Sequence, residues 1–142
     1  MDRMIFVNLP VRDVRTSRDF YTALGFGVNE EFSDDQVACI VISDRIFVML
    51  LEHERFRDFI TTDIADARTT TQVLNALSAS SRAEVDDLVA RAVGAGGVAR
   101  TPIEEGGMYG HSFADPDGHV WELIHMDMST GTGQDPELAA QS

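Results

Sequence analysis

The last apolar segment of the chain contains the residue types that are most able to bind a metal or to act as an acid or base. His119, Glu122 and His125 follow the pattern H-x-x-E-x-x-H, and imidazole and carboxylate groups are common ligands of Zn²⁺ and related ions. Residues 119–125 predict a strand, however, in which successive side chains point to opposite faces. The two histidines then share one face and Glu122 lies on the other, so the three do not form one site.

Glu122 on its own is a candidate acid, base or ligand contact. A carboxylate in a mostly apolar strand is costly to bury unless it is paired or protonated, and such groups gather at functional sites. The alternative is a solvated carboxylate, or one paired with an arginine.

Three other motifs are incomplete. Residues 110–114 (GHSFA) nearly match the G-x-S-x-G nucleophile elbow, but Ser112 is followed by a Pro-Gly turn and a strand instead of a helix. His53 and Glu54 lack the second histidine of H-E-x-x-H, because residue 57 is arginine. Residues 94–97 follow a predicted helix, so their glycines do not offer a helix N-terminus to phosphate. A serine hydrolase and a zinc protease of these types are therefore excluded.

The charge balance limits the classes of partner that the protein can bind. The chain has 11 basic residues, all arginine, and 24 acidic residues, which give a net charge of -13. We expect no nucleic-acid or anionic-membrane partner, since either would need a cationic face. The absence of lysine excludes Schiff-base chemistry and a P-loop lysine.

The cysteine content and the segment pattern favour a cytoplasmic protein. Cys39 is the single cysteine, so an intrachain disulfide and a cysteine-built zinc site are excluded. No secretory-type leader and no apolar run of about 20 residues is present, and we expect the mature protein to be as written.

The first half of the chain predicts a strand, a helix and a hairpin. Residues 4–9 form an apolar run, and Asp13 is placed to cap the following helix by accepting free amides of its first turn. Gly25 and Gly27 end that helix. Residues 36–42 and 46–51 predict the hairpin. The inward positions of the helix recur at three- and four-residue spacings: Val14, Ser17, Tyr21 and Leu24.

The second half predicts the same elements. Residues 73–78 predict a strand, and Ser81 with Glu84 forms a capping box that opens a second amphipathic helix. Strands at 108–114 and 119–125 follow, joined by the turn Asp-Pro-Asp-Gly. Residues 53–71 predict a crossover between the halves, carrying four large apolar side chains: Phe56, Phe59, Ile60 and Ile64.

The two halves are a repeat. The same 68 residues separate Phe6 from Leu74 and Asp13 from Ser81, and 73 residues separate Met49 from Glu122. We therefore predict an α+β fold of two tandem βαβββ units, with helices on one side of eight strands in curved mixed sheets that enclose a cavity. A single domain spans 1–127, with unit one at 4–52, the crossover at 53–71 and unit two at 72–127. Residues 128–142 predict a disordered tail.

Three segments give the chain a family resemblance: FYTALGF at the end of the first helix, AGG at the end of the second and DPDGHVWELI at the last hairpin. It resembles the vicinal oxygen chelate superfamily, which includes glyoxalase I, extradiol dioxygenases and bleomycin-resistance proteins. The resemblance implies the paired βαβββ fold. It also implies a homodimer, because members often complete the cavity with strands from a second chain.

The resemblance also implies where a metal would bind. The four ligand positions of the family's metal enzymes correspond here to Phe6, Met49, Leu74 and Glu122, and the repeat pairs the same positions. Three of them are apolar, and Ni²⁺, Zn²⁺ or Fe²⁺ cannot be held by one carboxylate with Phe, Met and Leu. We expect no metal and no cofactor.

The predicted site is an apolar pocket in which Glu122 is the catalytic or anchoring residue. The strand at 46–51 is apolar on both faces, which is also consistent with simple core packing. The predicted ligand-binding residues are Phe6, Asn8, Phe47, Met49, Leu51, Leu74 and Ala76.

Two functions of different class remain open. The first is a small-molecule binder that sequesters its ligand, or acts on it through Glu122 without a standard metal site. The alternative is a divalent-metal lyase, isomerase or dioxygenase with displaced ligands, and a purely structural or protein-binding module is a third possibility. The apolar residues at positions 6, 49 and 74 favour the first.

Overall fold

A computed structural model describes residues 1–127 of the 142-residue chain, and the predicted tail at 128–142 lies outside the described residues. In chain order the elements are β1 (Ile5–Val11), α1 (Val14–Ala23), β2 (Gly27–Val28), η1 (Glu30–Phe32), β3 (Val37–Val41), β4 (Ile46–Glu52), α2 (His53–Phe56), η2 (Arg57–Phe59), β5 (Leu74–Ser78), α3 (Arg82–Gly94), β6 (Val98–Ala99), β7 (Ile103–Glu105), β8 (Met108–Ala114) and β9 (Val120–Met126), where η marks a 3₁₀ helix.

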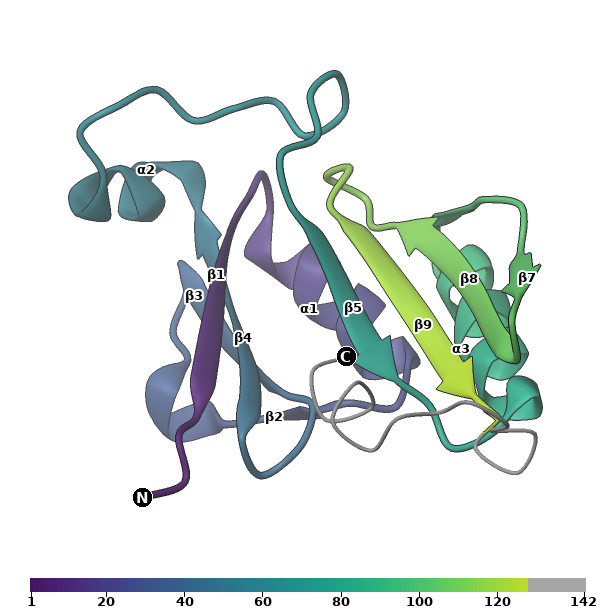
Figure 1. The fold of residues 1–142 in the computed structure, drawn as a ribbon. Coiled ribbons are helices and arrows are strands. Elements are labelled where there is room, and N and C mark those ends of the chain that lie inside the picture. Colours follow the sequence, from purple (N-terminus) through teal and green to yellow (C-terminus); the bar gives the residue numbers. More distant parts are fainter. Residues whose placement is uncertain (128–142) are drawn as a thin grey trace.

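The strands form two mixed sheets, one from each half of the chain (Figure 1). The first has the order β1-β4-β3-β2 and the second the order β5-β9-β8-β6, with β7 also paired to β8. In each sheet the first and last strands of the unit run parallel, while the other pairs are antiparallel. The predicted α+β fold of two βαβββ units is confirmed. The described part has nine strands where eight were expected, because unit two contains the two short strands β6 and β7.

The strand register reproduces the sequence repeat. Asn8 pairs with Met49 between β1 and β4, and the residues 68 and 73 positions further on, Ala76 and Glu122, pair between β5 and β9. Paired residues on neighbouring strands lie on the same face of a sheet. The repeat is therefore a repeat of structure, and Met49 and Glu122 occupy equivalent places in the two units.

Both long helices begin at the predicted caps. The Asp13 carboxylate accepts hydrogen bonds from the amides of Arg15 and Thr16, at 3.0 and 3.2 Å. In α3 the Ser81 hydroxyl accepts from the Glu84 amide at 3.0 Å. The return bond of the capping box shifts by one residue, because Glu84 accepts from the Ser80 amide and not from that of Ser81. Each cap satisfies amides that the first turn leaves without partners.

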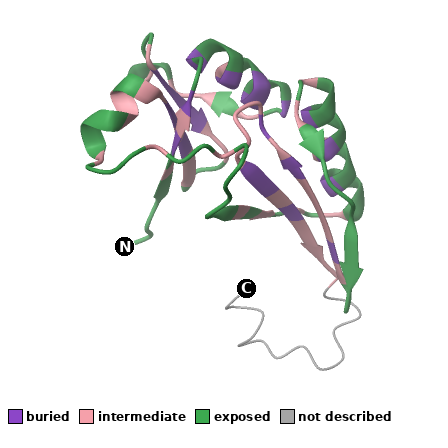
Figure 2. Ribbon diagram, turned by 90° about the horizontal axis from the view of Figure 1, so that it is seen from above, coloured by how far each residue is buried: buried purple, intermediate pink, exposed green. Residues whose placement is uncertain are grey.

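The core lies between the helices and the sheets (Figure 2). One cluster of buried side chains draws on both units: Phe20 and Tyr21 of α1 contact the rings of Phe113 in β8 and Trp121 in β9, respectively. The first unit's helix thus packs against the second unit's hairpin. The opposite faces of the sheets turn away from the helices, and the two sheets do not close into a barrel.

The crossover departs from the prediction in two ways. Its first residues form α2 and η2, which the mixed composition did not indicate. Phe59 is not a buried anchor, since its side chain is 64% exposed and lies under the Arg55 guanidinium, 4.5 Å from the ring centre. Phe56, Ile60 and Ile64 are half-buried, as an anchored segment requires.

In the part of the chain that the structure describes, no helix is long and apolar enough to span a membrane.

Candidate functional site

The five predicted ligand-binding residues of unit one share the face of its sheet opposite α1, which is open except at Leu51, where the side chain is buried. Phe6 pairs with Phe47 and Asn8 with Met49, while Leu51 pairs with Pro10 in the same parallel ladder. The Phe6 and Phe47 rings stack with their centres 4.9 Å apart. Alternate residues of both strands enter the core, where Val48 and Leu50 are fully buried. This face is therefore an apolar surface with an aromatic pair near one end.

Glu122 lies in the middle of the open face of unit two. Its neighbours across the sheet are Ala76 of β5 and Ser112 of β8, and Leu74 is two residues along from Ala76. Glu122 is half-buried and forms no hydrogen bond or ion pair with residues 1–127. It is a carboxylate with free acceptor oxygens on an otherwise weakly polar surface.

The two histidines of the H-x-x-E-x-x-H pattern are separate from Glu122, as strand parity predicted. A ring nitrogen of His125 (Nδ1) lies 3.1 Å from the Ala79 carbonyl, on the helix side of the sheet. His119 precedes β9, and its Nε2 donates to the Pro10 carbonyl at 2.7 Å. Each imidazole is held by a backbone carbonyl of another element.

The metal positions implied by the resemblance do not fit a divalent ion. Phe6, Met49 and Leu74 stand on the open faces with no oxygen or nitrogen donor, and Glu122 is the fourth position. Across residues 1–127, no group of three or more His, Cys, Asp or Glu side chains is placed to hold a metal. One carboxylate leaves most of an ion's coordination shell to water.

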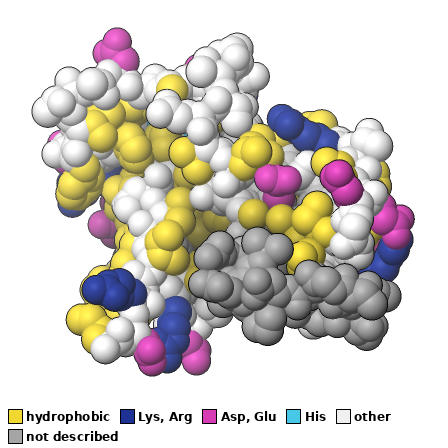
Figure 3. All heavy atoms as spheres, in the orientation of Figure 1, with side chains coloured by type: hydrophobic (Ala, Val, Ile, Leu, Met, Phe, Trp, Pro, Cys, Tyr) yellow, Lys and Arg dark blue, Asp and Glu magenta, His cyan; other side chains and the backbone are white. Residues whose placement is uncertain are grey.

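The open faces expose large apolar side chains in the single chain (Figure 3). Phe6 is 49% and Leu74 54% exposed, although both belong to strands. A cavity of about 370 Å³ beneath the crossover includes Asn8, and a hollow of about 1130 Å³ between the two units includes Ala76. Neither is lined by Phe6, Met49, Leu74 or Glu122, so the predicted residues form two surfaces and not one enclosed pocket.

A buried polar network joins the units behind these faces. Asp115 is 4% exposed, and Oδ2 of its carboxylate accepts a hydrogen bond from the Tyr21 hydroxyl at 2.6 Å. Burial raises the pKa of Asp115, and burial together with the Asp115 charge raises the pKa of Tyr21 well above 10.0. The sequence marked Asp115 only as a turn residue, because its partner is 94 positions away.

Asp117 makes the second polar connection. Its two carboxylate oxygens accept from the Arg12 amide at 3.0 Å and from the buried Ser17 hydroxyl at 3.1 Å. Ser17 thus occupies an inward helix position because it has a carboxylate partner there.

The fold and its open faces define the class: a paired βαβββ protein. A family model described as bleomycin resistance protein-like N-terminal matches residues 3–43. Among curated proteins no match is found.

Solved structures match over most of the chain. Hypothetical protein SA1046 from S. aureus is 30% identical, with a TM-score of 0.74 over 88% of this chain and 94% of that one. A glyoxalase/bleomycin resistance protein/dioxygenase family enzyme from Burkholderia phytofirmans PsJN is 20% identical (TM-score 0.73; coverage 89% and 100%). A bleomycin resistance determinant encoded on transposon TN5 is also 20% identical (TM-score 0.62; coverage 89% and 99%). The chain thus has the fold of the glyoxalase/bleomycin resistance protein/dioxygenase structures, and its first part matches the bleomycin resistance protein-like family model.

Proposed function

We propose that this protein binds a small, mainly apolar organic molecule on its open sheet faces, and that Glu122 contacts a donor or cationic group of that molecule. One observation carries the proposal. At the four equivalent positions of the two units, three side chains are apolar and the fourth is a carboxylate with no partner among residues 1–127. Apolar walls with one polar contact are typical of small-molecule sites.

The ligand chemistry follows from the two surfaces. The stacked rings of Phe6 and Phe47, with Met49 beside them, offer a flat and polarizable platform to an aromatic or aliphatic body. Glu122, between Ala76 and Ser112, offers acceptor oxygens only. An amine or another donor group attached to an apolar body matches both.

A second copy of the chain completes the site in this proposal. Phe6 and Leu74 are about half exposed in one chain, and a homodimer that faces the two surfaces toward each other would remove them from water. The cavity predicted from the sequence would then form between subunits.

The ligand is either sequestered or transformed without a metal. The similarity to a bleomycin resistance determinant supports sequestration. Metal-free catalysis would use Glu122 as the acid or base. The metal-dependent lyase, isomerase or dioxygenase is less well supported, because three of the four family positions lack donor atoms.

Calorimetric titration tests the role of Glu122. The probes are bleomycin and the pair 2-phenylethylamine and 2-phenylethanol, which differ in charge but not in the apolar body. We expect Glu122→Gln to weaken binding of the amine about tenfold and to leave the alcohol nearly unchanged, because Gln keeps the shape and loses the charge. The control is Glu105→Gln, which removes an exposed carboxylate on β7.

Two results would overturn the proposal. Equal weakening by Glu122→Gln and Glu105→Gln would show that only the net charge matters. About one Ni, Zn, Fe or Mn per chain in the purified protein, lost in Glu122→Gln, would favour the metal enzyme.

A further inference from the structure

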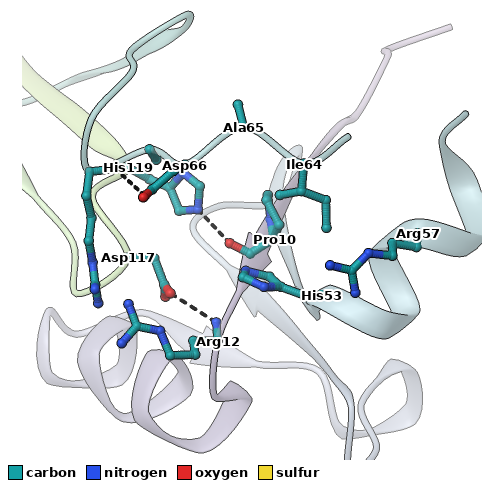
Figure 4. Close-up of a pocket in the computed structure, with 11 residues that line it drawn as sticks. Pro10, Arg12, His53, Arg57, Ile64, Ala65, Asp66, Asp117 and His119 are labelled. Atoms are coloured by element: carbon teal, nitrogen blue, oxygen red, sulfur yellow. Dashed lines mark hydrogen bonds between the residues drawn. The ribbon is translucent and has the colours of Figure 1, made fainter. Parts of the chain in front are cut away.

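We propose that the junction between the two units is a second binding site, specific for an oxyanion carried on a small apolar body. A cavity of about 250 Å³ opens there (Figure 4). Its walls come from the end of β1, from α2 and η2, from the crossover and from the β8–β9 turn. None of Phe6, Met49, Leu74 and Glu122 lines it, so the proposal is independent of the function proposed above.

The cavity is rich in cationic side chains. Arg12, Arg57 and Arg68 line it together with His53 and His119, although the whole chain has 11 arginines and a net charge of -13. Three guanidinium groups around one small cavity oppose the repulsion that an acidic protein exerts on anions. Guanidinium is also the side chain best suited to bidentate contact with carboxylate or phosphate.

The two acidic residues in the wall form no ion pair with these arginines. Asp117 accepts from the Arg12 amide and the Ser17 hydroxyl, and Asp66 accepts from the Arg68 amide at 3.0 Å. Neutral donors thus take up three of their four carboxylate oxygens.

The guanidinium donors remain available. Within the described residues, the side chains of Arg12 and Arg57 form no hydrogen bond or ion pair, and Arg68 donates only to the Pro116 carbonyl at 3.1 Å. In Figure 4 the Arg57 side chain points toward His53, and the Arg12 guanidinium lies beside Asp117. An anion would supply the acceptor that these groups lack.

The wall is fixed by close backbone packing. The His119 ring donates to Pro10, which joins the turn to β1. Gly118 has a φ of +96°, and a Cβ atom there would come within 2.7 Å of the Ala67 carbonyl carbon. The crossover can lie against the turn only because residue 118 is glycine. The backbone segments that carry the three arginines are therefore held around the cavity before a ligand binds.

The adjoining cavity of about 370 Å³ indicates what the anion is attached to. It shares Pro10, Ile64 and His119 with the cationic cavity and extends to Val7, Phe56, Ile60 and Val120. An oxyanion in the first cavity would place a substituent in the second, apolar one. A carboxylate or a phosphate monoester with an aromatic or short aliphatic body fits this shape.

Calorimetric titration of the full chain at low and high salt tests the site. The probes are benzoate, phenyl phosphate, inorganic phosphate and the neutral benzamide. We expect benzoate or phenyl phosphate to bind, inorganic phosphate to bind at least about fivefold more weakly, and benzamide not to bind. Arg57→Gln and Arg12→Gln should each weaken binding of the anion about tenfold. Arg100→Gln, an exposed arginine outside the cavity, should change it less than about twofold.

The outcomes separate the alternatives. Preference for benzoate or for phenyl phosphate assigns the anion as carboxylate or phosphate. Equal binding of benzamide, or equal loss in Arg57→Gln and Arg100→Gln, would overturn the proposal. Unchanged thermal stability of the variants would show that the fold is intact, and loss of anion binding with unchanged 2-phenylethylamine binding would separate this site from that of Glu122.

Discussion

The hydroxyl of Tyr21 on α1 donates a hydrogen bond of 2.6 Å to the buried carboxylate of Asp115, 94 residues further along the chain. The Trp121 indole donates to the same hydroxyl at 2.9 Å. The other oxygen of Asp115 accepts from the amides of Asp117 and His119, at 2.9 and 2.8 Å. One buried carboxylate therefore organises the β8–β9 turn and fastens it to the helix of the other unit.

Removal of the Tyr21 hydroxyl should destabilise the protein. Tyr21→Phe leaves Oδ2 of the Asp115 carboxylate and the Trp121 indole each without a partner, and we expect the free energy of unfolding to fall by about 2 kcal/mol. Tyr109→Phe is the control, since the Tyr109 hydroxyl bonds to the exposed carboxylate of Asp86. Urea denaturation monitored by Trp121 fluorescence measures both. Equal losses in the two variants would show that the buried network has no special role.

The raised pKa of Asp115 predicts a pH dependence. Burial is the main cause, and it outweighs the opposing effects of His119 and Tyr21. The folded state then binds the proton more tightly than the unfolded state, so Asp115 makes the free energy of unfolding fall as the pH rises from about 3.8 through the folded pKa.

Asp115→Asn cannot ionise and should remove this contribution. The difference in unfolding free energy, wild type minus variant, should decrease between about pH 4 and about pH 7. Thermal melts of both proteins across that range measure it. A constant difference would contradict the assignment of a raised pKa to Asp115.

Local signals in the sequence predicted the two long helices and the long strands, with their faces, correctly. Asp13 and Ser81 cap their helices because capping depends on amides within the next three residues. The sheet face on which Glu122 lies followed from the alternation of side chains along one strand. Contacts between distant segments left no such signal. Asp115 and Asp117 were visible only as turn residues, since nothing near them in the sequence indicates Tyr21 or Ser17.

The cationic cavity was beyond sequence reasoning for the same reason. Arg12 and Arg57 lie in different segments, and the path of the crossover brings them together. Residues 53–71 have no clear helical or strand periodicity, so neither α2 nor that path was predictable. The predicted ligand pocket could be derived only in part for a related reason. The strand register places the residues of each half on one face of a sheet, but it does not show how the two faces lie relative to each other in an assembly.

Gly118 should control the position of the crossover. Gly118→Ala puts a methyl group against the backbone of Ala67 and Arg68 at a positive φ, so both sterics and backbone conformation oppose it. We expect a loss of about 2 kcal/mol in stability, and faster amide hydrogen exchange in residues 64–70. Gly94→Ala is the control, since nothing lies within 4 Å of a Cβ there. Unaltered exchange in Gly118→Ala would contradict the packing described.

A dimer that covers the open faces should depend on Leu74. Its side chain is 54% exposed on β5, on the open face of unit two. Leu74→Glu would place a charge where the proposed partner packs, and an unpaired carboxylate in an interface is costly. We expect the dissociation constant of the dimer to rise by at least about 100-fold.

Sedimentation analysis at micromolar concentration measures this change. The wild type should sediment at twice its 15.6 kDa chain mass, and Leu74→Glu at the mass of one chain. Val93→Glu adds the same charge at an exposed apolar position on α3, on the helix side of the molecule, and should remain dimeric. If both variants stay dimeric, the interface lies elsewhere and the open faces are available to ligands in a single chain. If the wild type is already monomeric, Phe6 and Leu74 are exposed to solvent in the free protein, and ligand burial must come from one chain alone.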